Sequence, residues 1–449
     1  MTSPAAALDS ERWRRLIPVA FITYSFAYLD RSNYSIGAAG GLQAHLHITS
    51  TQSGLLGGLF FIGYFLFQVP AGTFAEQRSV KTLLFWSLSA WGVLAALQGV
   101  VTTYWLLLAD RFLLGVVEAV VLPAMLVFLT HWFTRAERGR ADTFLILGNP
   151  VTLLWMSVVS GYLVAALGYR WMFIIEGLPA IGWAFLFRRL TADRPCDAVW
   201  LPEPERDALE RALREEQRGL PPARGFREVA RSWNAVVLSL QYLLWSIGVY
   251  GLVFWLPAIV KHLTGQGIAS TGLLTAAPYA AAVIAMIAVS SASDRTGHRR
   301  VFTLVPLLIA SACFAVSYLT RGGTFTVSFI LLIVAAAGMY APYGPYFAQI
   351  PELLPASDAA PATGMINAFG GLGGFVGTYL VGALGGASSA VPFLFLSACL
   401  LLSALLMVAV RRPHAADRAD ISRGLVRADS GQPGRSGPPT GSPDYGPEA

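Results

Sequence analysis

Long apolar stretches, separated by short polar segments rich in arginine, recur along the whole chain. Each is about 18 residues or longer, which is enough for a helix to cross ~30 Å of hydrocarbon. The pattern predicts an all-α membrane protein with twelve transmembrane helices. The predicted spans are residues 16–39, 54–75, 82–101, 104–128, 142–166, 171–190, 235–260, 270–292, 301–319, 325–349, 361–385 and 390–410.

The longest polar segment inside the chain divides these spans into two groups of six. Two six-helix halves joined by a loop are the layout of the major facilitator fold, in which the halves rock about a site at the midplane. A tail rich in proline, glycine, serine and charge is expected to be disordered. The predicted parts are an N-terminal half (1–190), a cytosolic connecting loop (191–233), a C-terminal half (234–411) and the tail (412–449).

Basic residues concentrate in every second connecting segment, and the segments on the other side hold only Arg170, Lys261 and Arg321. Because positively charged loops stay in the cytosol, we expect both termini and the connecting loop to be cytosolic. The expected location is the inner (plasma) membrane, with the lipid bilayer as a partner and the chain as a monomer.

The amino-acid composition excludes several classes of function. The chain is 55% hydrophobic and 13% charged, about half the charge of a soluble protein. The net charge of +6 is spread between spans, which does not favour nucleic-acid binding. The three cysteines are far apart, so we expect neither a disulfide nor a metal site. Nothing indicates a cofactor or the nucleophile–base arrangement of an enzyme.

Two opposite charges, Asp30 and Arg31, lie deep in the first span, although a charge at the bilayer centre costs roughly 2.5–3.5 kcal/mol. In span 4, Arg111 and Glu118 are seven residues apart and share a helix face. Counting ~1.5 Å per residue puts Asp30 and Arg111 at similar depth. An Asp30–Arg111 contact would leave Arg31 free for a ligand and Glu118 without a partner. A purely structural ion pair is the alternative.

A buried carboxyl without a partner tends to bind a proton, because burial disfavours its charged form. Glu118 is therefore the leading candidate for proton coupling, and Asp30 is the next. The planar fork of Arg31 suits bidentate capture of a carboxylate. Arg111 is assigned to structure or gating.

Further polar residues interrupt the apolar spans. The candidate substrate ligands besides Arg31 are Tyr28, Tyr64, Asn149 and Asn367, with helix packing as the alternative for each. The candidate structural or gating residues are Glu76 and Arg78 after span 2, Asp294 and Arg295 after span 8, and Gly374, whose small-xxx-small spacing allows close helix contact. In span 10 two prolines lie among Tyr340, Tyr343 and Tyr346, which indicates either a binding edge or a kink with interfacial aromatics.

Several segments together resemble the anion:cation symporter family of the major facilitator superfamily. The matching segments are Tyr28-Leu29-Asp30-Arg31-Ser32-Asn33, Leu114-Gly115-Val116-Val117-Glu118-Ala119 with Pro123, Trp171-Met172-Phe173-Ile174-Ile175-Glu176-Gly177, Phe254-Trp255-Leu256-Pro257, and residues 367–377. The family often has Pro-Gly after the span 4 acid, and this chain has Pro123-Ala124 instead.

The resemblance implies proton-driven import of organic carboxylates such as sugar acids, tartrate or aromatic acids. It places the family's span 1 pair on Asp30 and Arg31, and its span 4 arginine and proton-carrying glutamate on Arg111 and Glu118. Its span 2 tyrosine and span 11 asparagine fall on Tyr64 and Asn367, and Asn149 matches a span 5 polar ligand approximately.

Two other functions remain open from the sequence. One is a proton-coupled antiporter that exports drugs or metabolites, which would need no arginine for the substrate. The other is a transporter-like sensor that binds an anion. Arg31 argues against the first, and the tail has no recognisable signalling domain.

Overall fold

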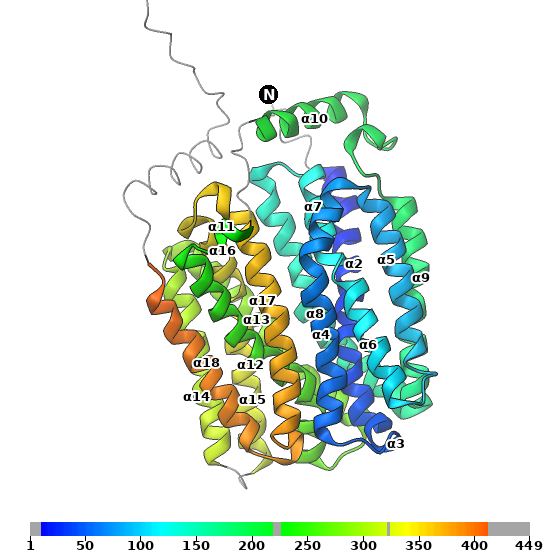
Figure 1. The fold of residues 1–449 in the computed structure, drawn as a ribbon, viewed down its shortest axis with the longest axis vertical. Coiled ribbons are helices and arrows are strands. Elements are labelled where there is room, and N and C mark those ends of the chain that lie inside the picture. The colour runs from blue at the N-terminus through cyan, green and yellow to red at the C-terminus, as the bar shows by residue number, and fades with distance from the viewer. Residues whose placement is uncertain (1–9, 219–225, 321–323, 412–449) are drawn as a thin grey trace, which may run out of the picture.

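The computed structural model describes residues 10–218, 226–320 and 324–411. This part of the chain is a bundle of long helices without a strand (Figure 1). The predicted disordered tail, 412–449, lies outside the described residues. We call the end of the bundle where the first helix begins the amino-terminal face, and the other end the opposite face.

The first half of the chain forms six membrane-crossing segments. They are α2 (Ser10–Gly37), α4 (Ser50–Gln77), α5 (Val80–Leu97), α6 (Tyr104–Glu118) with α7 (Val121–Trp132), α8 (Arg135–Leu167) and α9 (Tyr169–Leu190). Short pieces, η1 (Ala38–Leu42) and α3 (Gln43–His45), connect α2 to α4.

The connector contains η2 (Pro195–Asp197), α10 (Glu203–Arg218) and α11 (Phe226–Val229), and α10 lies across the amino-terminal face (Figure 1). Six further segments follow it. They are α12 (Trp233–Thr264), α13 (Ile268–Thr296), α14 (Arg299–Leu319), α15 (Phe325–Tyr340) with α16 (Tyr343–Leu353), α17 (Ala356–Ala383) and α18 (Val391–Ala409), with η3 (Gly386–Ser388) before the last.

Among the described residues, eleven helical segments are long and apolar enough to cross a membrane, and α6–α7 and α15–α16 each count as one. The twelfth is α2, which runs through the bundle (Figure 1). It is less apolar because it carries three arginines near its start and the Asp30–Arg31 pair about three quarters of the way along it. The predicted fold class, with twelve transmembrane helices, is confirmed.

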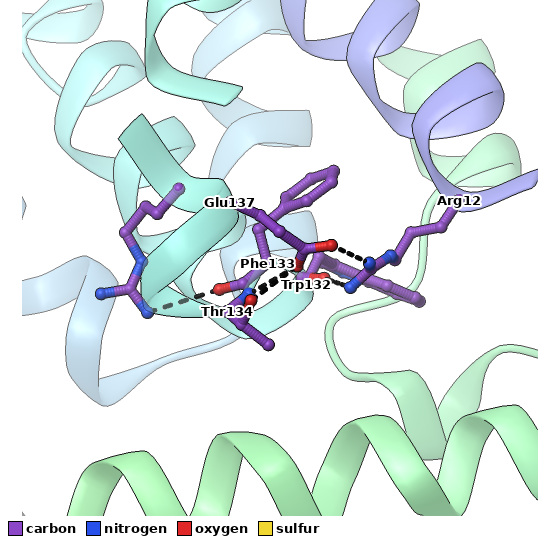
Figure 2. Close-up of polar contacts among 6 residues, drawn as sticks. Arg12, Trp132, Phe133, Thr134 and Glu137 are labelled. Atoms are coloured by element: carbon purple, nitrogen blue, oxygen red, sulfur yellow. Dashed lines mark hydrogen bonds and ion pairs between the residues drawn. The ribbon is translucent and has the colours of Figure 1, made fainter. Parts of the chain in front are cut away.

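Polar contacts fasten the start of α2 to the junction between α7 and α8 (Figure 2). Arg12 donates to the backbone oxygen of Trp132 at 2.7 Å and to Glu137 Oε1 at 2.5 Å. The other oxygen of Glu137 accepts from the backbone N–H and the hydroxyl of Thr134, which completes a capping box at the start of α8. One carboxylate therefore caps one helix and holds a second.

The two halves meet along a set of close backbone contacts, which we call the inter-half seam: α4 with α17, α8 with α13, and α2 with α12. Gly54 lies against the backbone of Thr378, and Gly161 against Gly272. Lys261 donates to the backbone oxygen of Ala39 at 2.6 Å. These contacts all lie toward the opposite face.

Toward the amino-terminal face the seam loosens along α17. Gly371 packs against the ring of Tyr64. Gly364 lies seven residues earlier on the same face of the helix, and a side chain there would meet nothing within 4 Å. The halves are thus in close contact at the opposite face and leave free space beside α17 nearer the amino-terminal face.

The packing predicts a large difference between two glycines in helices. In Gly115→Ala the new methyl group would overlap the backbone oxygen of Phe60, which cannot move away as a side chain can. We expect a loss of stability of about 1–3 kcal/mol, measured as a lower Tm of the detergent-purified chain. Gly364→Ala is the control and should leave Tm unchanged or raised, because its surroundings are open. Equal effects of the two changes would contradict this packing.

Candidate functional site

A buried ion pair joins α2 and α6 of the first half. Arg31 Nε is 3.0 Å from Glu118 Oε1, and its Nη2 bonds the same oxygen. Arg31 is 8% exposed and Glu118 is 1% exposed. The expectation that Arg31 is free and Glu118 has no partner is therefore wrong for this conformation. We call this contact the Arg31–Glu118 pair.

Asp30 and Arg111, whose similar estimated depth made a contact possible, have other partners. Asp30 Oδ1 accepts from Asn33 Nδ2 at 3.0 Å, within its own helix. Arg111 Nε donates to the backbone oxygen of Leu56 at 3.3 Å. The reason is rotational: each residue turns a helix by about 100°, so Asp30 and Arg31 cannot both face α6. The depth estimate was also offset, because Arg111 lies against Tyr34, about one turn further along α2, and Glu118 lies at the level of Arg31.

Aromatic rings surround both buried guanidinium groups. That of Arg31 lies 4.8 Å from the ring centre of Tyr28, 4.7 Å from that of Tyr64 and 5.3 Å from that of Phe60. That of Arg111 lies 4.9 Å from the ring of Tyr34. Such contacts stabilise a cation in surroundings without water. Tyr28 and Tyr64, both predicted as ligands, are thus placed directly against Arg31.

The second half contributes a residue that the sequence analysis missed. The hydroxyl of Tyr250 accepts from Arg31 Nη1 at 3.3 Å and lies 3.4 Å from the hydroxyl of Tyr28. Tyr250 follows Tyr242 by eight residues in α12, which places both near one stripe of that helix. This spacing was the only sequence signal, and a tyrosine pair within an apolar span is a weak one.

Beyond Tyr250 the second half presents a group of stacked aromatic side chains, which we call the tyrosine wall. Tyr242 stacks on Tyr346 with ring centres 5.5 Å apart, and Tyr343 contacts Trp245 at 4.6 Å and Tyr340 at 5.7 Å. The break between α15 and α16 at Pro342 positions Tyr343 in this group, because proline cannot continue the hydrogen bonding of a helix.

Little free space remains beside the Arg31–Glu118 pair. A cavity of about 10 Å³ is lined by Arg31, Ser32, Phe61, Tyr250, Val253 and Phe254. This volume holds no organic ligand, so the residues around Arg31 must move apart before one enters. The lining comes from α2 and α4 on one side and α12 on the other.

The remaining predicted ligands, Asn149 and Asn367, are not in contact with Arg31 and do not line the small cavity beside it. Asn149 is buried in α8, and its side-chain oxygen has no hydrogen-bond partner among the described residues. Asn367 is partly buried in α17, one turn before the glycine that packs on Tyr64. Each half of the chain thus contributes one of these amides, and that of Asn149 has an unsatisfied oxygen.

Of the predicted structural or gating residues, Arg111 and Gly374 are buried inside the bundle, with Gly374 against the ring of Phe61, and the others lie near the amino-terminal face. Asp294 accepts from Arg299 Nη1 at 2.8 Å, and Arg299 Nε also donates to Glu352 at 2.6 Å. Neither Arg299 nor Glu352 was predicted. Arg295 is exposed, and so is Arg78, whose guanidinium lies 5.8 Å from the ring of Phe74. The side chain of Glu76 lies outside the described part of the structure.

Comparison with known proteins shows the family of the chain. The family model for the Major Facilitator Superfamily matches residues 20–378 and 264–433. A putative tartrate transporter of Agrobacterium vitis is 30% identical over 89% of this chain and 90% of its own length. A quinolone resistance transporter of Acinetobacter baumannii is also 30% identical, over 82% of this chain and 86% of its own length.

Among solved structures, the inward open conformation of the xylose transporter XylE from E. coli superposes with a TM-score of 0.73, at 12% identity, over 91% of this chain and 98% of that one. This likeness shows the shared fold. The resemblance found in the sequence is thus confirmed, and the chain belongs to the major facilitator superfamily of transporters.

Proposed function

We propose that this protein imports an organic carboxylate together with a proton. The observation that carries the proposal is the Arg31–Glu118 pair: a permanent cation, buried at membrane depth, whose only ion-pair partner among the described residues is one carboxylate. The predicted assignment of Arg31 to the substrate and Glu118 to the proton follows from how such a pair exchanges partners.

Arginine does not lose its proton in proteins, so Arg31 needs an anion in every state. Without substrate, ionised Glu118 fills that role. When the carboxylate of a substrate takes the guanidinium, Glu118 is left buried and without its partner, and burial then favours its protonated form. Substrate and proton therefore promote each other's binding, and this linkage is reciprocal. Coupling between substrate and proton then requires only that Arg31 exchanges Glu118 for the carboxylate of the substrate.

The direction follows from the arginine distribution. We propose that the amino-terminal face and both termini are cytosolic, because the basic segments lie on that side. The membrane is then the inner membrane, and the two halves, 1–190 and 234–411, rock about the Arg31–Glu118 pair. A more acidic exterior loads Glu118, and the cytosol removes the proton and releases the substrate. One chain contains every proposed ligand, so a monomer suffices.

The tyrosine wall favours one kind of carboxylate. In the second half, α12 has no charged residue before Lys261, and residues 325–351 have none. The body of a substrate held at Arg31 would therefore lie against aromatic rings rather than charged groups. Rings stack well on a flat aromatic body, whereas the hydroxyls of a sugar acid need many hydrogen bonds. Among sugar acids, tartrate-like acids and aromatic acids, we propose an aromatic carboxylate.

Other residues take supporting roles in this proposal. Tyr28 and Tyr64 hold the guanidinium between their rings, and Arg111 fastens α6 to α4. Asn149 and Asn367 supply hydrogen bonds to the polar edge of the substrate once the site opens. The drug-exporting antiporter remains the second candidate, because one relative is named for quinolone resistance.

The first prediction concerns the proton. Glu118→Gln removes the charge and keeps the shape, so it resembles the protonated state at every pH. We expect the variant to bind substrate and exchange it across a membrane, because exchange needs no net proton movement. It should not accumulate substrate against a gradient. Proteoliposome counterflow and pH-driven uptake, measured side by side, check this. Full pH-driven accumulation by the variant would move the proton site to another acid, with Asp30 as the next candidate.

The second prediction concerns the guanidinium. Arg31→Lys keeps the charge but loses the planar fork that binds a carboxylate through two hydrogen bonds. We expect affinity to fall by about tenfold or more, since one charged hydrogen bond contributes about 1.5–3 kcal/mol. Calorimetry on the purified protein measures it. The control is Arg214→Lys on the exposed surface of α10, which should bind normally. Unchanged affinity in Arg31→Lys would favour the antiporter.

The third prediction concerns the substrate's body. Benzoate and phthalate should compete for uptake better than tartrate and galactonate. Tyr343→Leu should weaken benzoate binding by about threefold to tenfold, because an aromatic contact is worth ~0.5–1.5 kcal/mol beyond its buried area. It should affect tartrate less. Tyr162→Leu, on an exposed part of α8, is the control. A preference for galactonate that survives Tyr343→Leu would exclude the aromatic class and leave the carboxylate proposal standing.

A further inference from the structure

A second, much larger cavity lies at the amino-terminal face, away from the Arg31–Glu118 pair. Its volume is about 630 Å³, and its lining includes Arg15, Lys81, Arg189, Asp193, Val199 and Trp200. We propose that it binds the phosphate group of an anionic membrane lipid, drawn from the leaflet at that face.

The three basic residues come from three different helices. Arg15 lies in the second turn of α2, Lys81 at the start of α5 and Arg189 at the end of α9. All three positions lie where the helices leave the apolar part of the membrane. The fold therefore gathers, at the height of lipid headgroups, three cations that are distant in the sequence.

These cations are available to a ligand. None of the three forms an ion pair within the described residues, and the Nε of Arg15 is buried without a hydrogen-bond partner. The guanidinium of Arg15 lies 4.8 Å from the ring centre of Trp200, which fixes its direction. A phosphate group with several acceptor oxygens matches such a set of donors.

The two acids in the lining offset only part of this positive charge. Asp193 is occupied: one oxygen accepts from the hydroxyl of Ser79 at 2.5 Å, and the other from the backbone N–H of Lys81 at 2.8 Å. It thus caps the start of α5. Asp197 lies in η2, where it is exposed to solvent. The positive charge inside the cavity remains in excess.

Features of the rim favour a lipid over free phosphate. Val199 lines the cavity and is 97% exposed, which places an apolar side chain where an acyl chain would leave. Trp200 stacks on Trp132 with ring centres 5.5 Å apart, and tryptophan is enriched at the membrane–water interface. Basic pockets between transmembrane helices bind anionic lipid headgroups in this way.

The test compares lipids on the full chain. Purified protein is incubated with phosphatidylglycerol, phosphatidylcholine or inorganic phosphate, and bound lipid is counted by native mass spectrometry. We expect phosphatidylglycerol to bind at least about tenfold more tightly than phosphatidylcholine, as three charged contacts near ~1 kcal/mol each allow. Arg15→Gln/Lys81→Gln/Arg189→Gln should lose this preference. The control Arg14→Gln/Arg140→Gln/Arg211→Gln, at exposed positions outside the cavity, should keep it.

Three results would overturn the proposal: equal binding of the two lipids, an unchanged preference in the triple variant, or inorganic phosphate displacing the lipid at equal concentration. The last would assign the cavity to a soluble phosphate. If the triple variant does not fold, Arg189→Gln alone decides, because its exposed side chain leaves the helix packing intact. It should weaken phosphatidylglycerol binding by about threefold to fivefold, the share of one cation at ~1 kcal/mol.

Discussion

A guanidinium that cannot be neutralised, buried inside a membrane protein, constrains everything around it. Taking a charge out of water costs several kcal/mol even after the protein relaxes, and a partner must offset that cost. Here the partner is Glu118, at the end of α6, and the rings of Tyr28 and Tyr64 enclose the remaining faces of the group. The second half completes the arrangement with the hydroxyl of Tyr250. α2 packs against α12, and α6 packs against α4, so that side chains from all four helices meet at this one charge.

The two halves of the chain differ in the side chains that they place inside the membrane. The first half holds the buried charges, and the second presents aromatic rings and few charged groups inside the membrane. In the proposed function, a site between them recognises two different chemical properties of one molecule, its charge on one side and its body on the other. Because the halves move relative to each other in this fold, a ligand that needs both is held only when they come together.

The helices could be predicted from the sequence, because a long apolar segment that crosses a membrane has to be helical to satisfy its backbone hydrogen bonds. The ends of the helices were predicted less accurately. The span predicted at 142–166 is a helix from Arg135 to Leu167, since the capping box at Thr134 starts it before the apolar part begins. The sequence analysis identified Arg31 and Glu118 as candidate functional residues, but it did not predict that they contact each other. Pairing depends on how each helix is rotated about its axis, and an all-round apolar helix such as α12 carries no periodic signal to define that rotation. Tyr250 was missed for the same reason.

The glycines of the inter-half seam bear on how easily the protein changes shape. Where Gly54 lies against Thr378, and Gly161 against Gly272, one side of each contact has no side chain to be ordered. Ordering a long side chain costs up to about 2 kcal/mol of entropy, and ordering a glycine side chain costs nothing. Closing the two halves together at the opposite face therefore costs little side-chain conformational entropy. It gains dispersion contacts and, from Lys261 to Ala39, one polar contact. Such a surface separates and reforms at low free-energy cost, which the proposed rocking of the two halves requires.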